Sequence, residues 1–146
     1  MEEIKNTKGK IMSIDFGDTR TGLAVSDPGR LLASGVGYIS PGGIVKTADA
    51  VAAEALERGI SALIVGLPKN MNGSEGPRAG RCREFADLLR ARLDIPVVLV
   101  DERLTTVEAT RYLNATDTRG KKRKGAIDSL AAEIILQSAL ERLKNI

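Results

Sequence analysis

The stretch KIMSIDFGDTRTGLAVSD, residues 10–27, decides how the rest of the chain is expected to fold. Its first apolar run, residues 11–14, predicts a buried strand that ends on the carboxylate of Asp15. A turn with two glycines follows, and a second apolar run at 23–25 returns the chain, so a β-hairpin is predicted. An unpaired buried carboxylate is costly, and a cation would remove that cost. Asp15 is therefore a candidate functional residue, although an Asp that only caps the turn is the alternative.

The composition limits the chemistry that this hairpin could support. The chain has 146 residues, 42% hydrophobic and 28% charged, as expected for one globular domain over residues 1–146. It has no histidine, and its one cysteine, Cys82, excludes an internal disulfide and a cysteine-based zinc site. Aromatic residues make up only 3%, which argues against the base-stacking platforms of single-strand binders. Any catalysis must therefore use carboxylates, Lys, Arg and hydroxyl groups.

The positive charge is concentrated in one short segment, residues 119–124. Subtracting its five cations from the net charge of +3 leaves −2 for the rest of the chain. With Gly120 and Gly125 as flexible joints, this basic run suits a clamp on a phosphate backbone, and a solvated loop is the alternative. Its cations are Arg119, Lys121, Lys122, Arg123 and Lys124.

Working outward from the hairpin, the sequence predicts three strands followed by alternating helices and strands. The turn signal Asp27-Pro28-Gly29 and a third strand at 31–39 make residues 10–39 an antiparallel meander. The order βββαβαβαα predicts a mixed sheet with helices on both faces. The later elements are expected at 45–58 (helix), 61–66 (strand), 77–93 (helix), 95–100 (strand), 105–114 (helix) and 125–144 (helix), after a frayed tail at 1–8.

Further carboxylates are predicted to lie near Asp15. Asp101 and Glu102 follow the strand at 95–100, and open α/β sheets bind ligands at the carboxyl ends of their strands. Asp128 lies near the start of the last helix, where its helical neighbours Ala131, Ala132 and Ile135 form an apolar face, so its carboxylate is expected to point at the sheet. The alternative for Asp128 is a helix-start acid favoured by the macrodipole.

Carboxylates from two strands and one helix, without any histidine, indicate hard divalent cations. Mg²⁺, or Mn²⁺ in its place, prefers carboxylate oxygens and acts on phosphates. Two such ions can activate a water and stabilise the leaving oxygen of a phosphodiester. The sequence therefore predicts a metal-dependent phosphodiester hydrolase.

Four segments in this order resemble the YqgF family of the RNase H-like superfamily, which is related to RuvC-type Holliday-junction resolvases. They are DFGDTRTGLAVSD (15–27), VGLPKNMNGSEGPRA (65–79), VDERLTT (100–106) and KGAIDSLAAEIIL (124–136). The resemblance implies an α/β RNase H-like fold with five strands in the order 3-2-1-4-5. It also implies a nuclease that matures the 5′ end of pre-16S rRNA in ribosome biogenesis, with resolution of DNA junctions as the alternative.

The motif match implies that Asp15, Glu102 and Asp128 are the catalytic, metal-binding residues. Asp101 is the less certain neighbour, since strand alternation sends only one of the two adjacent acids inward. Thr19 and Asn72 depart from the family pattern, and both lie in loops, so these departures bear on substrate contacts rather than on metal binding.

Basic and amide side chains near these acids are the predicted contacts to nucleic acid. Arg20 and Arg103 flank the acids, where they would hold phosphate oxygens or simply neutralise the carboxylates. Lys69 and Asn70 lie on a glycine-rich loop that would grip RNA or form a plain turn. Together with the basic run, these residues predict a partner that is structured RNA or branched DNA. We expect a monomer or weak homodimer. Because the chain lacks a long apolar segment and begins with the polar stretch MEEIKNTKGK, we also expect a cytoplasmic location and no membrane partner.

Two functions of other classes compete with the nuclease. DFGDTRTG also resembles the phosphate-binding hairpin of actin-like ATPases and sugar kinases, but those enzymes need two lobes and 146 residues supply one. No GxxxxGK[ST] loop is present either. A non-catalytic RNA- or protein-binding module with the same fold remains the second alternative, and a Mg²⁺-dependent cleavage assay separates it from a nuclease.

We expect the basic run to contribute affinity for nucleic acid, not chemistry. Neutralising its five cations should weaken RNA binding and flatten the slope of log K against log[salt] by roughly 3–4 units, at about 0.7 per single-strand phosphate contact. Binding titrations over a range of salt concentrations measure this slope. An unchanged slope would show that the run is only a solvated loop.

Overall fold

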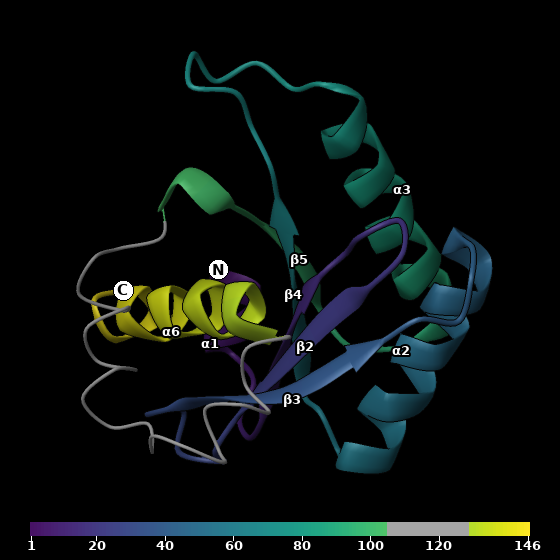
Figure 1. Cartoon of the computed structure of the whole chain (residues 1–146). Coiled ribbons are helices and arrows are strands. Elements are labelled where there is room, and N and C mark those ends of the chain that lie inside the picture. The colour runs from purple at the N-terminus through teal and green to yellow at the C-terminus, as the bar shows by residue number, and fades with distance from the viewer. Residues whose placement is uncertain (105–128) are drawn as a thin grey trace, which may run out of the picture.

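The computed structural model describes residues 1–104 and 129–146, and its five strands form one mixed sheet in the order β3-β2-β1-β4-β5 (Figure 1). The first three strands are antiparallel, whereas β4 and β5 run parallel to β1. The predicted meander, the strand order 3-2-1-4-5 and the mixed sheet are thus confirmed. The elements are α1 (Glu2–Lys5), β1 (Ile11–Asp15), β2 (Thr21–Ser26), β3 (Ala33–Ile39), α2 (Ile44–Arg58), β4 (Ala62–Leu67), α3 (Pro77–Arg92), β5 (Val97–Asp101), η1 (Glu102–Leu104) and α6 (Leu130–Lys144).

Helices cover both faces of the sheet, as the element order predicts (Figure 1). Alternation along β1 divides its side chains between two cores. Met12 and Ile14 belong to the core beneath α2 and α3, whereas Ile11 belongs to the core beneath α6. Ser13 also faces α6, because its Oγ donates a 2.6 Å hydrogen bond to the carbonyl of Ala132. The same alternation places Asp15 on the α6 side, at the end of the central strand.

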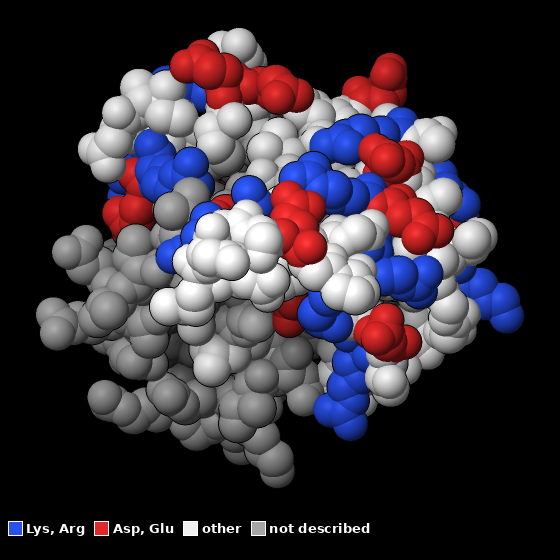
Figure 2. Space-filling model, turned by 90° about the horizontal axis from the view of Figure 1, so that it is seen from above, with Lys and Arg blue, Asp and Glu red and all other residues white. Residues whose placement is uncertain are grey.

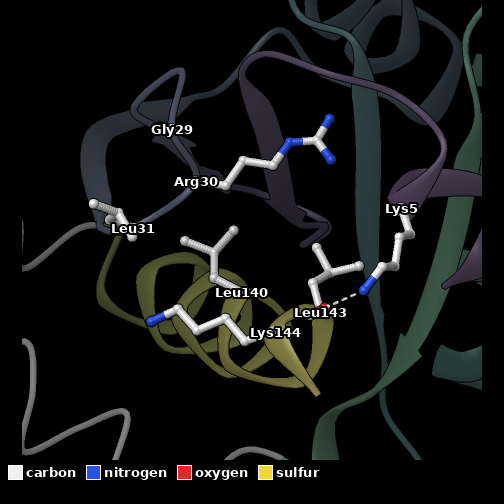
Figure 3. A pocket seen from close by; sticks show the side chains of 7 residues that line it. All are labelled: Lys5, Gly29, Arg30, Leu31, Leu140, Leu143 and Lys144. Carbon is white, nitrogen blue, oxygen red and sulfur yellow. Dashed lines mark hydrogen bonds between the residues drawn. The ribbon is translucent and has the colours of Figure 1, made fainter. Parts of the chain in front are cut away.

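The prediction of a frayed tail at residues 1–8 is wrong, because α1 is anchored by contacts from distant parts of the chain. Ile4 is fully buried, and the Arg30 guanidinium donates to the carbonyls of Ile4 and Gly9 at 2.9 and 2.7 Å. Lys5 donates to the Leu143 carbonyl in α6, beside a hollow of about 200 Å³ (Figure 3). The polar N-terminal segment thus contains one buried apolar side chain, Ile4. The residue that binds its carbonyl, Arg30, lies 26 residues further along the chain.

The remaining described elements lie close to their predicted ranges. α2 ends at Gly59, whose left-handed φ of 66° suits the predicted glycine stop, and α3 begins at Pro77 as expected. The predicted helix at 105–114 and the first residues of the predicted helix at 125–144 lie outside the described residues. In the described ranges no helix is long and apolar enough to span a bilayer.

Directional polar contacts dock α6 on the sheet. The buried Gln137 accepts a 2.9 Å hydrogen bond from the Ala33 amide and donates to the Leu31 carbonyl at 3.2 Å. At Gly35 in β3, an added Cβ would collide with Ser129 Oγ and Glu133 Oε1. The missing side chain at Gly35 therefore lets the first turn of α6 lie directly against β3.

Gly35→Ala should consequently destabilise the protein. Ser129 and Glu133 are buried and have little room to move, so overpacking should lower the free energy of unfolding by roughly 1–3 kcal/mol. The matched control is Gly80→Ala, at an exposed α3 position where an added Cβ meets nothing within 4 Å. The control should raise stability by about 0.5–1 kcal/mol through helix propensity. Chemical denaturation measures both, and equal stability of the two variants would contradict close docking at Gly35.

Candidate active site

Asp15 is the central acid of the candidate site. It ends β1, the middle strand of the sheet, and is partly buried. Burial raises the pKa of its carboxyl, and the positive charge of Arg78 offsets part of that rise. The strand thus holds a carboxyl group in a setting that disfavours its charged form.

Glu102 reaches the same region from β5 across the face of β4. It begins η1, directly after β5, and an added Cβ at Gly66 in β4 would lie 3.3 Å from its Cγ and Cδ. Ile14 pairs with Val65, so Gly66 follows in the strand next to Asp15. The same added Cβ would lie 2.8 Å from Ile135 Cδ1 of α6. Gly66 therefore makes room for Glu102 between β4 and α6.

The two carboxylates are close enough to interact electrostatically. Burial is the main cause of the raised pKa of Glu102, and the negative charge of Asp15 is the next largest. Asp101 adds a smaller rise, and Arg78 lowers the pKa in part. The site therefore combines desolvation with like-charge repulsion, a combination typical of functional carboxylates.

Arg78 is a site residue that the sequence reasoning missed. It stands in the first turn of α3, and its Nη2 donates a 2.9 Å hydrogen bond to the Phe16 carbonyl, one residue after Asp15. Its charge lowers the pKa values of both Asp15 and Glu102. The sequence signal for Arg78 was its position within the 65–79 segment, just after the loop that carries Lys69 and Asn70.

Cys82 lies one turn further along α3 than Arg78 and is buried in the core beneath α2 and α3. Burial raises the pKa of its thiol to about 11, with Glu102 and Asp15 adding to the rise and Arg78 opposing it. The thiol is therefore protonated at neutral pH and is not a nucleophile.

Asp101 faces a different partner from its neighbour Glu102. The Arg103 side chain binds both carboxylate oxygens of Asp101, with Nη2 2.7 Å from Oδ2 and Nε 3.2 Å from Oδ1. These bonds, with one from the Arg103 backbone amide, lower the pKa of Asp101. Arg103 thus neutralises a carboxylate, which is one of the two roles considered for it. Glu102, and not Asp101, is the acid whose pKa the charge of Asp15 raises.

The other predicted contact residues that the structure describes, Lys69, Asn70 and Arg20, each have a local partner. Lys69 Nζ lies 3.8 Å from Glu75 Oε2, and Asn70 Nδ2 donates a 2.9 Å hydrogen bond to Ser74 Oγ. Both side chains therefore have partners within their own loop. Arg20 lies over the ring of Tyr38, with Cζ 4.8 Å from the centroid. Viewed from above, the Lys and Arg side chains of the described residues alternate with Asp and Glu, so the described part of this face shows no continuous basic surface (Figure 2).

The third predicted acid and the basic run cannot be placed beside these residues. Asp128, Arg119, Lys121, Lys122, Arg123 and Lys124 all lie outside the described residues. Of the three α6 positions expected to share a face with Asp128, Ala132 and Ile135 are buried, but Ala131 is exposed. Within residues 1–104 and 129–146, no group of three Asp, Glu, Cys or His side chains is arranged to hold a metal ion.

The fold matches solved structures of the RuvC type. T. thermophilus RuvC in complex with a Holliday junction substrate aligns with a TM-score of 0.66 at 15% identity, over 94% of this chain and 96% of that one. The fowlpox virus resolvase with Holliday junction DNA gives 0.57 at 13% identity, over 92% and 98%. At these identities the likeness shows the fold alone, which is RNase H-like as predicted.

The family follows from closer matches. The chain belongs to the RuvX family, described as Holliday junction resolvase, whose model matches residues 9–142. It is 46% identical over 134 residues to a Listeria monocytogenes protein, covering 90% of this chain and 97% of that one. It is 45% identical over 131 residues to a Halothermothrix orenii protein, covering 90% and 94%. Both relatives are named "Putative pre-16S rRNA nuclease", so the family resemblance predicted from the motifs is confirmed.

The raised pKa values of Asp15 and Glu102 make stability depend on pH with a predictable sign. A carboxyl whose pKa is higher in the folded state binds more protons there, so the free energy of unfolding falls as pH rises through its titration range. Asp15→Asn removes one of the two repelling charges. In metal-free buffer its melting temperature should exceed that of the unchanged protein at pH 7, and the gain should shrink as pH falls toward about 4, the ordinary carboxyl range.

Asp101→Asn is the matched control, because its pKa shift has the opposite sign. The folded state lowers the pKa of Asp101, so removing this charge should lower the melting temperature at pH 7. Melting temperatures that change in the same direction in both variants would contradict the electrostatic description of the site.

Proposed function

We propose that this chain is a nuclease that hydrolyses phosphodiester bonds and processes the 5′ end of pre-16S rRNA in the cytoplasm. One observation carries the proposal: Asp15 at the end of the central strand and Glu102 over Gly66 are both partly buried, both have raised pKa values, and the charge of Asp15 adds to the rise at Glu102. The names of the curated relatives suggest the substrate. A module that only binds nucleic acid gains nothing from two buried, neighbouring carboxylates, which lower the stability of the folded state.

The donor set fits a hard divalent cation, Mg²⁺ or Mn²⁺. Asp15 and Glu102 offer only oxygen ligands, and burial and repulsion give both a reason to accept a positive charge between them. Asp128 is the third proposed ligand, from outside the described residues. Such an ion, when bound, supplies Lewis-acid activation of water and stabilisation of the leaving oxygen.

The chain's own residues would orient the substrate around this pair. Asp15 is fixed by β1 and Glu102 by the room over Gly66, so neither acid depends on a long loop for its position. Arg78 uses Nη2 on the Phe16 carbonyl, and a guanidinium has five N–H donors. We propose that its remaining donors bind oxygens of the scissile phosphate. Lys69, Asn70, Arg20, Arg103 and the cations of 119–124 are the proposed outer contacts.

Junction DNA is the second candidate substrate, and the description of the matching family favours it. The same carboxylate chemistry would cleave either substrate, because each contains a phosphodiester with the same reacting atoms. RNA with a 5′ extension and a four-way DNA junction must therefore be tested side by side.

The experiment compares single acid-to-amide changes on both substrates, with Mg²⁺, with Mn²⁺ and with a chelator. Asp15→Asn, Glu102→Gln and Asp128→Asn should each lower the cleavage rate by at least about a hundredfold while binding is retained, because each change removes a charge near the reacting phosphate. Asp101→Asn is the matched control and should retain most of the activity, since Asp101 is already paired with Arg103.

Four outcomes decide between the candidates. Metal-dependent cleavage of the RNA but not the junction supports rRNA processing, and the reverse supports junction resolution. Near-normal cleavage by Asp15→Asn would contradict the proposed carboxylate mechanism. Cleavage of neither substrate by the unchanged protein would favour the non-catalytic module.

A further inference from the structure

Tyr38 shares a row of the sheet with Asp15. Asp15 pairs with Gly22 across β1 and β2, and Gly22 pairs with Tyr38 across β2 and β3. Residues paired directly across antiparallel strands point to the same face, and neighbouring strands lie about 4.8 Å apart. The backbone of Tyr38 is therefore about 10 Å from that of Asp15, on the same side of the sheet. Gly22, itself buried, places no side chain between them.

The Tyr38 ring is held beside the β1–β2 turn and is still accessible. The Arg20 guanidinium lies 4.8 Å from the ring centroid, a cation–π contact. The Ser40 hydroxyl donates a 2.7 Å hydrogen bond to the Thr19 carbonyl, which ties that turn to the end of β3. Although Arg20 covers part of the ring, 41% of the residue's surface stays exposed. The exposed ring of Tyr38 and the guanidinium of Arg20 are thus held together, two strands away from Asp15 on the same face of the sheet.

We infer that Tyr38 is a base-stacking residue, and that with Arg20 it forms a subsite for a nucleotide near the phosphate that Asp15 faces. A base has an apolar face that stacks on an aromatic ring, and the guanidinium serves the adjoining phosphate. The inference rests on the proposed function for the identity of the ligand, a single-stranded segment of nucleic acid. The low aromatic content argues against a platform of several rings, and this subsite needs only one.

The test measures binding in an Asp15→Asn background, so that cleavage does not enter. The probe is a single-stranded RNA oligonucleotide and a set of copies, each with one abasic position. Tyr38→Leu should weaken binding of the intact RNA by roughly 5- to 150-fold, the range for losing one base–aromatic stack. Tyr38→Phe keeps the ring and should bind normally. Leu56→Ala, an exposed apolar position in α2 on the opposite face, is the control and should also bind normally.

Two further readouts separate stacking from a general loss of structure. In the Asp15→Asn background, one abasic position should weaken RNA binding when Tyr38 is present and have no effect when Tyr38→Leu is added. A Tyr38 with a purely structural role would not give this dependence on one abasic position. Because the chain has no Trp, Tyr38→Trp introduces a single indole whose fluorescence should fall when a base stacks on it. No indole response, equal binding by Tyr38→Leu, or no binding of RNA at all would overturn the subsite.

The outcome for the subsite is distinguishable from that for the proposed function. If Tyr38→Leu binds normally while the unchanged protein cleaves RNA, the subsite fails and the nuclease stands. If the abasic pattern appears in a protein that cleaves nothing, the subsite stands and the nuclease fails.

Discussion

The burial of two neighbouring carboxyl groups, Asp15 and Glu102, is the constraint on which the rest of the site depends. Two carboxylates in a partly buried setting raise the free energy of the folded state unless something compensates them. Desolvation is the largest cause of both raised pKa values, so the surrounding packing contributes more than the charges do. Gly66 is part of that packing, since its missing side chain lets Glu102 and Ile135 lie over β4. The packing around the sheet therefore holds the two carboxylates where their charged forms raise the free energy of the folded state.

Directional contacts also fix α6 on the sheet, between its middle and the end opposite Asp15. An apolar helix face alone tolerates small shifts, whereas hydrogen bonds with defined partners fix a helix in one register. Ser13 binds the backbone of α6 from the central strand, and Gln137 binds the backbone around β3. The close approach at Gly35 sets the position of the first turn. Because Asp128 precedes α6 by two residues, this docking is what would bring a third acid to a reproducible position.

Local patterns predicted the sheet and the helices well, because alternation, glycine stops and turn signals are encoded within short stretches. The features that sequence reasoning missed depend on distant contacts. Nothing in residues 1–8 indicates that Arg30 will donate to the Ile4 carbonyl and to the Thr7 hydroxyl. Likewise, strand alternation left Asp101 and Glu102 equivalent until the pairing with Arg103 and the room over Gly66 separated them. Arg78 lay in a recognised segment, but its reach toward Asp15 depends on how α3 packs.

Among the described residues, the distribution of arginines explains why the charges of Asp15 and Glu102 are only partly compensated. Arg103 forms a close ion pair, but with Asp101, and that carboxyl has a lowered pKa. Arg78 lies nearer to the other two acids, yet its described hydrogen bond goes to a backbone carbonyl, and it offsets only part of their raised pKa values. An arginine bound directly to Asp15 would return its pKa toward the ordinary range, and a divalent cation would then have less to gain there. Partial compensation keeps the acids compatible with folding while leaving their oxygens a reason to bind a cation.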